Sequence, residues 1–483
     1  MAAETESEVQ GEREEAFSKW YIDTVLKAEL ADYTPVRGSM VIRPYGYAIW
    51  ELIQGYVDRE LKATGHQNAY FPLFIPLSFI QKEAEHVEGF APQLAVVTHG
   101  GGEELTEPLV VRPTSETIIY DMLSKWIESY RDLPVLLNQW ANVVRWEIRT
   151  RPFLRTAEFL WQEGHTAHAT FEEADAEARL ILDLYVRFIQ DELAIPVYQG
   201  RKTESEKFAG GLITYTMEAL MRDSKALQMG TSHNLGQNFS KAFDVTFLDR
   251  QGNRDYPWST SWAVTTRLIG ALIMVHGDSK GLRLPPRVAP IQVIIVPIWR
   301  TDDDREKVAP HVERVNALLA AAGIRVKVDW RDQVTPGFKF NDWELKGVPV
   351  RLEIGPRDVQ SDSAVAVRRD TREKTPIPVA ELTDRVPALL ESVQASLYEN
   401  AREFVRAHTS DAQTWEELRA RLDDPGGFVR VNWCDTKECE AALAAEKATV
   451  RAIPLDETES TPTGPCVCCG QPAQFRCMVA RAY

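Results

Sequence analysis

A proline-rich segment, GLRLPPRVAP at 281–290, divides this sequence into two parts with different hydrophobic periodicity. Three prolines without regular apolar spacing are typical of a linker, because proline interrupts helices and central strands alike. After it, short strand-like runs alternate with helical stretches. We expect strands near 291–296, 324–328, 348–354 and 364–367, and helices over 304–322, capped by Gly323, and from about 379. This alternation predicts a small α/β domain with a partly parallel sheet.

Before the linker, apolar residues recur mostly at helical spacing. Two helices are predicted, one over 12–31 and one after Pro44 that ends at Gly65 in a left-handed cap. A strand-like run covers 69–76. A later apolar stripe comprises Leu180, Ile181, Leu184, Tyr185, Phe188 and Ile189. These patterns indicate core packing rather than chemistry. Beyond about residue 400 we expect a helix and then an irregular, cysteine-bearing region.

The composition is that of a folded protein with several domains. With 483 residues, 44% apolar and 26% charged, the chain predicts two to four domains at roughly 100–200 residues each. No apolar run approaches the roughly 20 residues of a membrane-spanning helix, and the acidic start resembles no targeting signal, so we expect a cytoplasmic protein without membrane contact. The net charge is −16, but residues 291–390 carry equal numbers of acidic and basic side chains. That segment is the best candidate to meet a polyanion.

All six cysteines lie between Cys434 and Cys477. Such clustering points to a metal site rather than to disulfides spread through the fold. Cys434 and Cys439 form one close pair, and Cys466 and Cys469 form a second that could enclose a structural zinc with four thiolates. Cys468 is an alternative partner for Cys466, whereas Cys477 is expected to be a free thiol. The competing interpretation is that these are four reduced thiols without a metal.

Four arginines crowd the segment VVRWEIRTRPFLRTAEFLWQEGHTAH at 143–168. Arg145, Arg149, Arg151 and Arg155 flank Pro152, and the pattern predicts a strand, a basic loop and a returning strand. The planar guanidinium donates two parallel hydrogen bonds to an anionic oxygen and is always charged. The segment could therefore grip a triphosphate, although a solvated basic loop would have the same composition.

The same segment resembles motif 2 of the class II aminoacyl-tRNA synthetases through Arg145, Glu147 and Phe159, and FLWQEGHTAH resembles prolyl-tRNA synthetases in particular. Further stretches carry the resemblance along the chain from about residue 15. They are HQNAYFPLFIP (66–76, motif 1), RPTSET (112–117), KFAGG (207–211), GTSH (230–233), TSWAVTTRLIGALIMVHGD (260–278, motif 3) and the final RAY. The pattern is similar to the archaeal/eukaryotic-like type of this family.

This resemblance implies three domains. Residues 1–285 would form an α+β class II synthetase catalytic domain, an antiparallel sheet flanked by helices. Residues 286–395 would form an α/β anticodon-binding domain, and residues 396–483 a small C-terminal α/β zinc-binding domain. Motif 1 implies a homodimer in which 71–76 is buried at the interface. Tyr483 resembles that of relatives in which the tail packs near the catalytic domain.

By the same resemblance, the protein would activate L-proline with ATP and Mg²⁺ and transfer it to tRNA-Pro. Arg145 would hold the α-phosphate and the substrate carboxylate, and Arg267 the γ-phosphate. Glu147 would accept from the adenine amino group, and Phe159 would stack on the ring. Gln228 and Thr231 complete the implied ATP site. Positioning and charge stabilisation would supply most of the catalysis.

The proline pocket must hold a secondary ammonium and a compact apolar ring. The resemblance assigns the polar contacts to Thr114, Glu116 and either Glu163 or His165, besides Arg145. Trp161 and Phe208 would form the apolar walls, and His233 would close the pocket. Apolar contact discriminates small analogues weakly, by roughly 10–200-fold per methylene, so we expect misactivation of alanine. Only residues 168–260 separate motifs 2 and 3, so we expect no editing insertion of the bacterial type.

In the anticodon-binding part, 336–358 resembles the recognition stretch. Lys339, Lys346 and Arg351 could contact phosphates there, and Phe338, Phe340 or Trp343 could stack on a base. Which of them reads a base stays open.

Two substitutions depart from the family pattern. Ala157 stands where relatives often carry a polar or basic residue, and Ala263 replaces the glycine common in motif 3. Neither removes a charged group of the mechanism.

Two rival assignments remain. A non-catalytic tRNA-binding or regulatory paralogue would be expected to lose the phosphate-gripping arginines, yet both are present. A threonine- or histidine-specific synthetase is the other rival. A metal-using threonine pocket would need cysteine in the catalytic part, and none occurs before Cys434.

Overall fold

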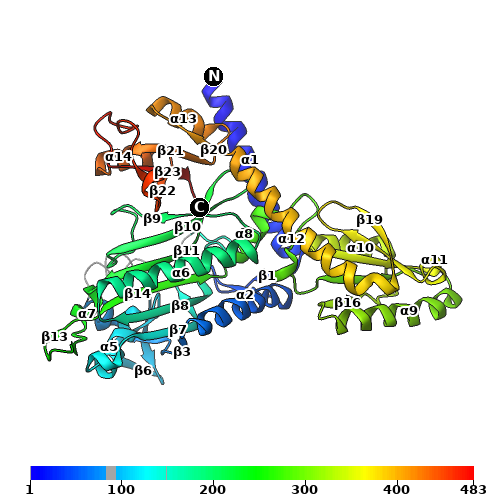
Figure 1. The fold of residues 1–483 in the computed structure, drawn as a ribbon, viewed down its shortest axis with the longest axis horizontal. Coiled ribbons are helices and arrows are strands. Elements are labelled where there is room, and N and C mark those ends of the chain that lie inside the picture. Colours follow the sequence, from blue (N-terminus) through cyan, green and yellow to red (C-terminus); the bar gives the residue numbers. More distant parts are fainter. Residues whose placement is uncertain (1, 83–93, 148) are drawn as a thin grey trace.

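The computed structural model describes residues 2–82, 94–147 and 149–483, with side chains described from Glu15 onward. Figure 1 shows three regions: a large sheet covered by helices, a smaller α/β body around α9 (Asp302–Ala321), and a C-terminal region around α14 (Lys437–Ala445). The long helix α12 (Leu382–Ala407) runs between the second and third regions.

The large sheet, which the family resemblance assigns as the catalytic sheet, contains strands in the order β9-β10-β11-β14-β8-β7-β3. All neighbours pair antiparallel except β3 and β7, which are parallel. The bounds are β3 Gln67–Asn68, β7 Val135–Val144, β8 Glu158–His168, β9 Tyr198–Arg201, β10 Ile213–Leu220, β11 Ala226–Gly236 and β14 Trp258–Thr265. The antiparallel sheet, and the strand–loop–strand of motif 2 within it, confirm the sequence prediction.

Helices and smaller strands surround this sheet. The two predicted N-terminal helices are α1 and α2, and Gly65 has the expected left-handed backbone, with φ +93°. Of the strand predicted at 69–76, only the last part is a strand, namely β4. The elements are α1 Ala2–Lys27, β1 Ala31–Tyr33, β2 Met40–Ile42, α2 Pro44–Ala63, β4 Phe74–Pro76, α3 Leu77–Ile80, β5 Ala95–Gly100, β6 Glu103–Val111, α5 Glu116–Trp126, α6 Phe171–Asp191, α7 Asn238–Ala242, β12 Phe247–Leu248, β13 Arg254–Asp255 and α8 Arg267–His276.

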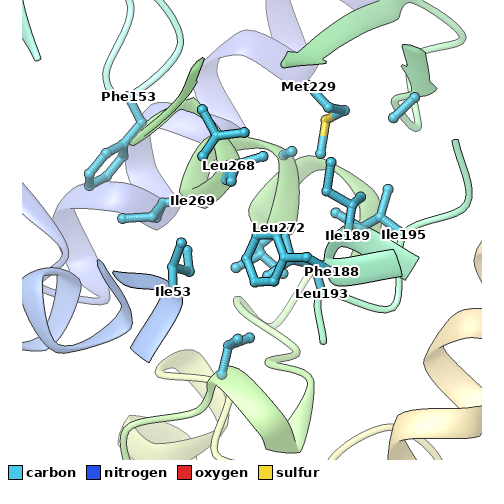
Figure 2. Packing of buried hydrophobic residues seen from close by; sticks show 14 of the residues in the cluster. Ile53, Phe153, Phe188, Ile189, Leu193, Ile195, Met229, Leu268, Ile269 and Leu272 are labelled. Atoms are coloured by element: carbon cyan, nitrogen blue, oxygen red, sulfur yellow. The ribbon is translucent and has the colours of Figure 1, made fainter. Parts of the chain in front are cut away.

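The main hydrophobic core lies where α8 packs beside the end of α6 and beside α2 (Figure 2). In this view Leu272 of α8 lies beside Phe188 of α6, whereas Ile269 of α8 lies near Phe153 and Ile53. The stripe predicted on α6 is correct except at one position: Leu180 is exposed and Leu182 is buried instead. The residues between motifs 2 and 3 form α6, β9, β10, β11 and the short elements that follow, so this span builds the sheet and its cover.

The second region has the predicted partly parallel sheet, in the order β16-β15-β17-β18-β19. β15 is parallel to β16 and β17, whereas β18 and β19 add antiparallel. The elements are β15 Val293–Pro297, α9, β16 Val326–Val328, α10 Pro336–Leu345, β17 Val350–Ile354, α11 Pro356–Gln360, β18 Ser363–Arg368, β19 Lys374–Pro378 and α12. Sequence reasoning missed β19, a mostly exposed strand with two prolines.

The predicted linker at 281–290 is a packed segment rather than a free connection. Leu282, Leu284 and Val288 are buried in the main core. The backbone N–H groups of Leu282 and Leu284 donate to the carbonyls of Leu345 and Gly347 at the end of α10.

A salt bridge next to the linker also ties the first two regions together. The guanidinium of Arg369 donates two hydrogen bonds to Asp278, at 3.0 and 2.7 Å, just beyond the end of α8. The linker and this salt bridge therefore hold the second region directly against the catalytic sheet's helices.

The C-terminal region differs from the irregular structure expected. Its strands β20 (Thr409–Asp411), β21 (Phe428–Trp433), β23 (Phe475–Arg481) and β22 (Ala448–Pro454) continue the catalytic sheet beyond β9, with α13 (Trp415–Asp423), α14 and α15 (Glu457–Ser460) between them. β22 joins β9 through the pairs Ile453 with Arg201 and Pro454 with Gly200. A Cβ at Gly200 would lie 2.5 Å from the Ile453 carbonyl oxygen, so glycine allows this close approach.

Among helices of the described residues, none combines the length and apolar character that crossing a bilayer requires.

We predict that Gly164→Ala destabilises the protein by about 3 kcal/mol, because the new methyl would overpack the sheet. Its Cβ would lie 2.0 Å from the buried ring of Trp262, the cross-strand partner of Gly164. The matched control is Gly55→Ala on α2, where, apart from the adjoining residues and the nearby backbone of the helix itself, no atom of the described residues lies within 4 Å of the new Cβ. This control should stabilise the helix by up to about 1 kcal/mol. Chemical denaturation measures both, and equal stabilities of the two variants would contradict the packing argument.

Candidate active site and cysteine cluster

A cavity of about 380 Å³ opens on the catalytic sheet, over β8, β10, β11 and β14 and beside the start of α8. All thirteen residues that sequence reasoning assigned to ATP or proline line it. They are Thr114, Glu116, Arg145, Glu147, Phe159, Trp161, Glu163, His165, Phe208, Gln228, Thr231, His233 and Arg267. Sequence segments from 114 to 267 thus converge on one space. The roles of the individual residues stay predictions.

Arg145 lies just after β7, where the motif 2 loop begins. Its Nε donates to the Pro113 carbonyl at 3.0 Å, and its guanidinium carbon lies 5.5 Å from the ring centroids of Phe159 and of Trp161. Burial lowers the pKa of Arg145, and the charges of Glu116, Glu163 and Glu147 oppose that shift. The side chain is therefore a fixed cation among aromatic rings and carboxylates.

Arg267 is the first residue of α8. Its Nε donates to the Leu154 carbonyl and its Nη1 to the Gln228 carbonyl, both at 3.3 Å. Burial, and then the positive charges of Arg145 and Arg155, lower its pKa to about 10. The group stays protonated at neutral pH, and a binding anion would relieve the repulsion among these cations. Arg145 and Arg267 thus line the same cavity rather than opposite faces of the fold.

The rim of the cavity near Phe159 carries a charged pair and an aromatic pair. Arg155 Nε lies 3.6 Å from Glu147 Oε1. The rings of Phe159 and Trp161 meet edge to face, with centroids 6.1 Å apart. This part of the cavity offers a flat ring and an acceptor carboxylate, which suits a heteroaromatic base with an exocyclic amine.

A network of buried hydrogen bonds orients Glu163. Gln139 Nε2 donates to Oε1 at 2.8 Å, the Ser115 hydroxyl donates to the same oxygen, and His165 Nε2 lies 3.0 Å from Oε2. Burial would lower the pKa of His165, but the hydrogen bond and charge of Glu163 outweigh it and raise the pKa. Glu163 and His165, which sequence reasoning gave as alternatives, therefore form one unit.

The inner end of the cavity combines acceptors with apolar walls. The Thr114 hydroxyl donates to Glu116, and both residues are buried. The rings of Phe208 and His233 lie 4.7 Å apart, and burial lowers the pKa of His233 to about 4. His233 is therefore neutral at physiological pH. Among the residues that the structure describes, none accepts a hydrogen bond from the buried Trp161 Nε1, which leaves a donor for a ligand.

Not all four loop arginines face the cavity, which corrects the interpretation that the four together could bind a triphosphate. Arg145 and Arg155 line it, but Arg149 is exposed away from it. Arg151 instead donates to Ser18 at 3.0 Å and lies over the ring of Tyr483, 5.2 Å from its centroid.

Sequence reasoning missed the residues that hold others in place, above all Ser115 and Gln139. Gln139 is the cross-strand partner of Glu163, a register that no local pattern reveals. Ser115 stands between two residues that were assigned, and this adjacency is the signal that could have pointed to it.

The two departures from the family pattern are accommodated locally. Ala157 is buried, and its N–H donates to the Gly38 carbonyl at 2.8 Å. A larger side chain there would meet the segment around Gly38, where a built Cβ would lie 3.1 Å from that of Ala157. Ala263 lines the cavity on β14 between Glu163 and Thr231, its partners in the sheet.

The cysteine cluster lies in the C-terminal region, away from the cavity. The sulfurs of Cys434, Cys439, Cys466 and Cys469 all lie within 4.8 Å of one another, with 3.4 Å between Cys434 and Cys439 and 3.7 Å between Cys434 and Cys469. A tetrahedral zinc with bonds of about 2.3 Å needs sulfurs about 3.8 Å apart, so the set fits this metal.

The surrounding chain suits the same four ligands. Gly470, with φ +70°, makes the turn after the second pair. Cys468 stays outside the cluster and Cys477 is buried on β23.

The cations expected to meet tRNA phosphates are engaged inside the protein, so this expectation is wrong for Lys339 and Arg351. Lys339 is buried and donates to the Asp329 carbonyl at 2.9 Å, and Arg351 pairs with Glu353 at 2.9 Å. Lys346 pairs with Glu29 at 2.8 Å.

The three aromatic candidates of α10 also differ in exposure. Trp343 is a core residue that donates to Asp329 at 2.8 Å, and Phe340 is half-buried under Arg351. Phe338 is 54% exposed and stays available for stacking on a base.

Tyr483 packs against the catalytic sheet, as the sequence resemblance predicted. Its hydroxyl donates to Asp223 at 2.6 Å and its N–H to the Ala226 carbonyl at 3.1 Å. Together with the contact from Arg151, this joins the end of the sheet to the motif 2 loop.

Comparison with known protein families covers most of the chain. Residues 98–276 match the class II core domain of tRNA synthetases for G, H, P, S and T, residues 292–389 match an anticodon binding domain, and residues 415–483 match the C-terminal domain of prolyl-tRNA synthetase.

Curated relatives match over nearly the whole length. A proline–tRNA ligase of Roseiflexus sp. (strain RS-1) is 55% identical over 477 residues, covering 98% of each chain. One from Symbiobacterium thermophilum is 56% identical over 97% of each chain. The chloroplastic/mitochondrial proline–tRNA ligase of Arabidopsis thaliana is 53% identical over 98% of this chain and 88% of its own.

A solved structure agrees in fold as well as in sequence. The crystal structure of prolyl-tRNA synthetase from Cryptosporidium parvum, complexed with halofuginone and AMPPNP, superposes with a TM-score of 0.93. It is 43% identical and covers 97% of this chain and 98% of its own. With these matches and the cavity above, the chain belongs to the prolyl-tRNA synthetases of the archaeal/eukaryotic-like type.

Proposed function

We propose that this protein ligates L-proline to tRNA-Pro in two steps, through a prolyl-adenylate, with release of pyrophosphate and then AMP. The observation that carries the proposal is the convergence of Arg145 and Arg267 on one cavity together with eleven further residues assigned from the motifs. A non-catalytic paralogue has no need for two half-buried arginines in such a space. The names of the curated relatives, all proline–tRNA ligases, support the same activity.

In the first step, the proline carboxylate attacks the α-phosphorus of ATP and pyrophosphate leaves. Arg145 holds the carboxylate beside the α-phosphate and offsets the charge that develops at phosphorus. Arg267 holds the γ-phosphate, and ATP binding is supported by the AMPPNP complex of the Cryptosporidium relative. Glu147, Phe159, Gln228 and Thr231 hold the nucleoside.

Mg²⁺ would supply positive charge that helps neutralise the phosphates when ATP is bound. Mg²⁺ prefers carboxylate and phosphate oxygens as ligands. Glu147 and Glu116 line the cavity, so their carboxylates would be the groups of the protein that could hold the ion.

The proline ring lies between Trp161 and Phe208, with His233 at its edge. Its ammonium donates to Thr114 and Glu116, while Glu163 fixes the orientation of His165. His233, held neutral by burial, adds no positive charge beside the ammonium. These roles follow the motif match and suit the donors and acceptors of the pocket.

In the second step, the 3′-terminal hydroxyl of tRNA-Pro takes the prolyl group from the adenylate. The region that matches an anticodon binding domain contacts the far end of the same tRNA, and Phe338 is its most exposed aromatic candidate. We propose domain boundaries at 285 and 395, as the sequence predicts. The cytoplasmic location stays a prediction.

We also propose a homodimer formed through the motif 1 segment. Phe71 and Ile75 are buried within the chain itself, so they do not serve the interface as expected. Tyr70 and Phe74 are 72% and 46% exposed and are the apolar side chains of this segment that a partner could cover.

We predict that Arg145→Gln and Arg267→Gln each lower proline-dependent ATP–pyrophosphate exchange by about 100-fold or more, the scale for removing one stabilising donor. Exchange measured with each of the twenty amino acids should be fastest with proline. Arg385→Gln, which breaks an exposed pair between Arg385 of α12 and Glu381 just before this helix, is the control and should exchange like the parent. Normal exchange by either cavity variant, or no exchange by the parent, would contradict the proposed function.

We predict that the purified protein forms alanyl-tRNA-Pro and does not hydrolyse it quickly. The reason is that the residues between motifs 2 and 3 build the catalytic sheet and its cover. Release of alanine from preformed alanyl-tRNA-Pro is the measurement. Hydrolysis well above the rate without protein would show editing and refute this prediction.

We predict one structural zinc per chain, held by Cys434, Cys439, Cys466 and Cys469. Metal analysis by mass spectrometry should find about one zinc in the parent and in Cys477→Ser, and much less in Cys466→Ser and Cys469→Ser. Because four thiolates leave no open position, the metal stabilises the fold rather than acting in catalysis. Equal zinc in Cys469→Ser and loss in Cys468→Ser would instead assign Cys468 as the fourth ligand.

A further inference from the structure

A buried ion-pair cluster joins the C-terminal region to strand β10, outside the lining of the cavity. Glu218 is fully buried and accepts hydrogen bonds from Lys202 Nζ at 2.7 Å and from Arg451 Nε and Nη2 at 3.0 and 2.8 Å. Lys202 and Arg451 are less than a tenth exposed. Hydrophobic residues of similar volume would avoid the desolvation cost of such a cluster, so stability alone does not explain it.

The two sides of the carboxylate have different partners. Oε1 accepts from Lys202 and from the Thr216 hydroxyl, the latter at 2.9 Å, whereas both hydrogen bonds to Oε2 come from Arg451. Within the described part of the chain, Arg451 therefore supplies both hydrogen bonds that Oε2 accepts. Its loss would leave that oxygen buried without a donor, at a cost that drives it toward another cation.

The strand register places this carboxylate beside the anchor of Arg267. Glu218 is the cross-strand partner of Gln228, whose carbonyl accepts from Arg267 Nη1 at 3.3 Å. A register shift between Met217 and Glu218 interrupts the regular pairing at this point. Glu218 and Arg451 also act on Arg267 electrostatically. The charge of Glu218 raises the pKa of Arg267, and the charge of Arg451 lowers it. Arg267 is thus anchored to the residue that lies directly across the strand pair from Glu218.

We propose that Arg451 is a positioning residue for the nucleotide: it holds the Glu218 carboxylate away from Arg267, so that the Arg267 guanidinium stays directed into the cavity. The inference rests on the proposed role of Arg267 in binding ATP. It gives the C-terminal region a part in the activation step, although no residue of that region lines the cavity.

The sheet explains how a residue so late in the chain reaches this place. β22 pairs with β9, and β9 pairs with β10, so β22 lies near the end of β10. Gly200 permits the close approach of β22, and the Arg451 carbonyl also accepts from Lys202 Nζ at 2.9 Å. Arg451 Nη1 donates to Thr449 at 3.0 Å, which fixes the guanidinium on its own strand.

The test compares Arg451→Gln, Glu218→Gln and the double variant Glu218→Gln/Arg451→Gln in proline-dependent ATP–pyrophosphate exchange. In Arg451→Gln, Glu218 turns to Arg267, and the KM for ATP should rise about tenfold or more while the KM for proline changes less than about twofold. The double variant lacks the carboxylate that displaces Arg267, so its KM for ATP should return to within about threefold of the parent. A merely structural role would make the double variant at least as defective as the single one.

The controls separate this proposal from folding defects and from the proposed function. Arg430→Gln breaks an exposed pair with Asp411 in the same region and should match the parent in both KM values. Exchange by the parent tests the function itself, and thermal unfolding of each variant reports stability. An unchanged KM for ATP in Arg451→Gln, or a double variant no better than the single one, would overturn the proposal.

If Arg451→Gln does not fold, Arg451→Lys and Glu218→Gln take its place. Arg451→Lys keeps a cation next to Glu218, and Glu218→Gln removes the carboxylate altogether. In neither variant can an unpaired carboxylate turn to Arg267, so both should keep the KM for ATP within about threefold of the parent. A tenfold rise in Glu218→Gln would show that Glu218 supports Arg267 directly, and would overturn the proposal.

Discussion

The site depends on the antiparallel pairing of β8 between β7 and β14. Successive side chains of a strand point to opposite faces of its sheet. Trp161, Glu163 and His165 therefore line the cavity, while Gln162 and Gly164 pack on the other face, against Tyr185 and Trp262. A shift of the register by one residue would exchange the two sets. The Trp262 ring fits only against Gly164, which has no side chain, and this contact helps to fix the register.

Charge is the second constraint on the cavity. Three arginines, Arg145, Arg155 and Arg267, line it together with four carboxylates, those of Glu116, Glu147, Glu163 and Glu206, so its opposite charges largely offset one another before a ligand arrives. Burial and mutual repulsion depress the pKa of Arg267, and Glu218, held by Arg451, opposes that shift. Such a site is organised in advance for a polyanion, because its dipoles and charges need little rearrangement when the ligand binds.

The parts of the fold that depend on sequence patterns within one helix or strand could be predicted, and the parts that depend on pairing between distant segments could not. The elements at 291–367 followed from periodicity, since each strand and helix carries its own pattern. The C-terminal strands did not, because β22 pairs with β9, about 250 residues earlier, and nothing near Ile453 indicates that partner. The linker was misjudged for the same reason: its prolines suggest a free segment, but Leu282 and Leu284 are buried by distant helices.

The sequence by itself determined the periodicity of most helices and strands, whereas motif residues such as Arg145, Glu163 and Arg267 could be assigned to the site only through the family resemblance. The cysteine spacing predicted a metal site but left Cys468 and Cys469 as alternatives, and the fold brings Cys469 into the cluster. Only the tertiary structure decided which charges are free to act. Arg151 turns to Tyr483, Lys339 is buried, and Arg451 pairs with Glu218 from the far end of the chain. The availability of a charge depends on burial and on partners brought by the fold, and neither is written in the neighbouring residues.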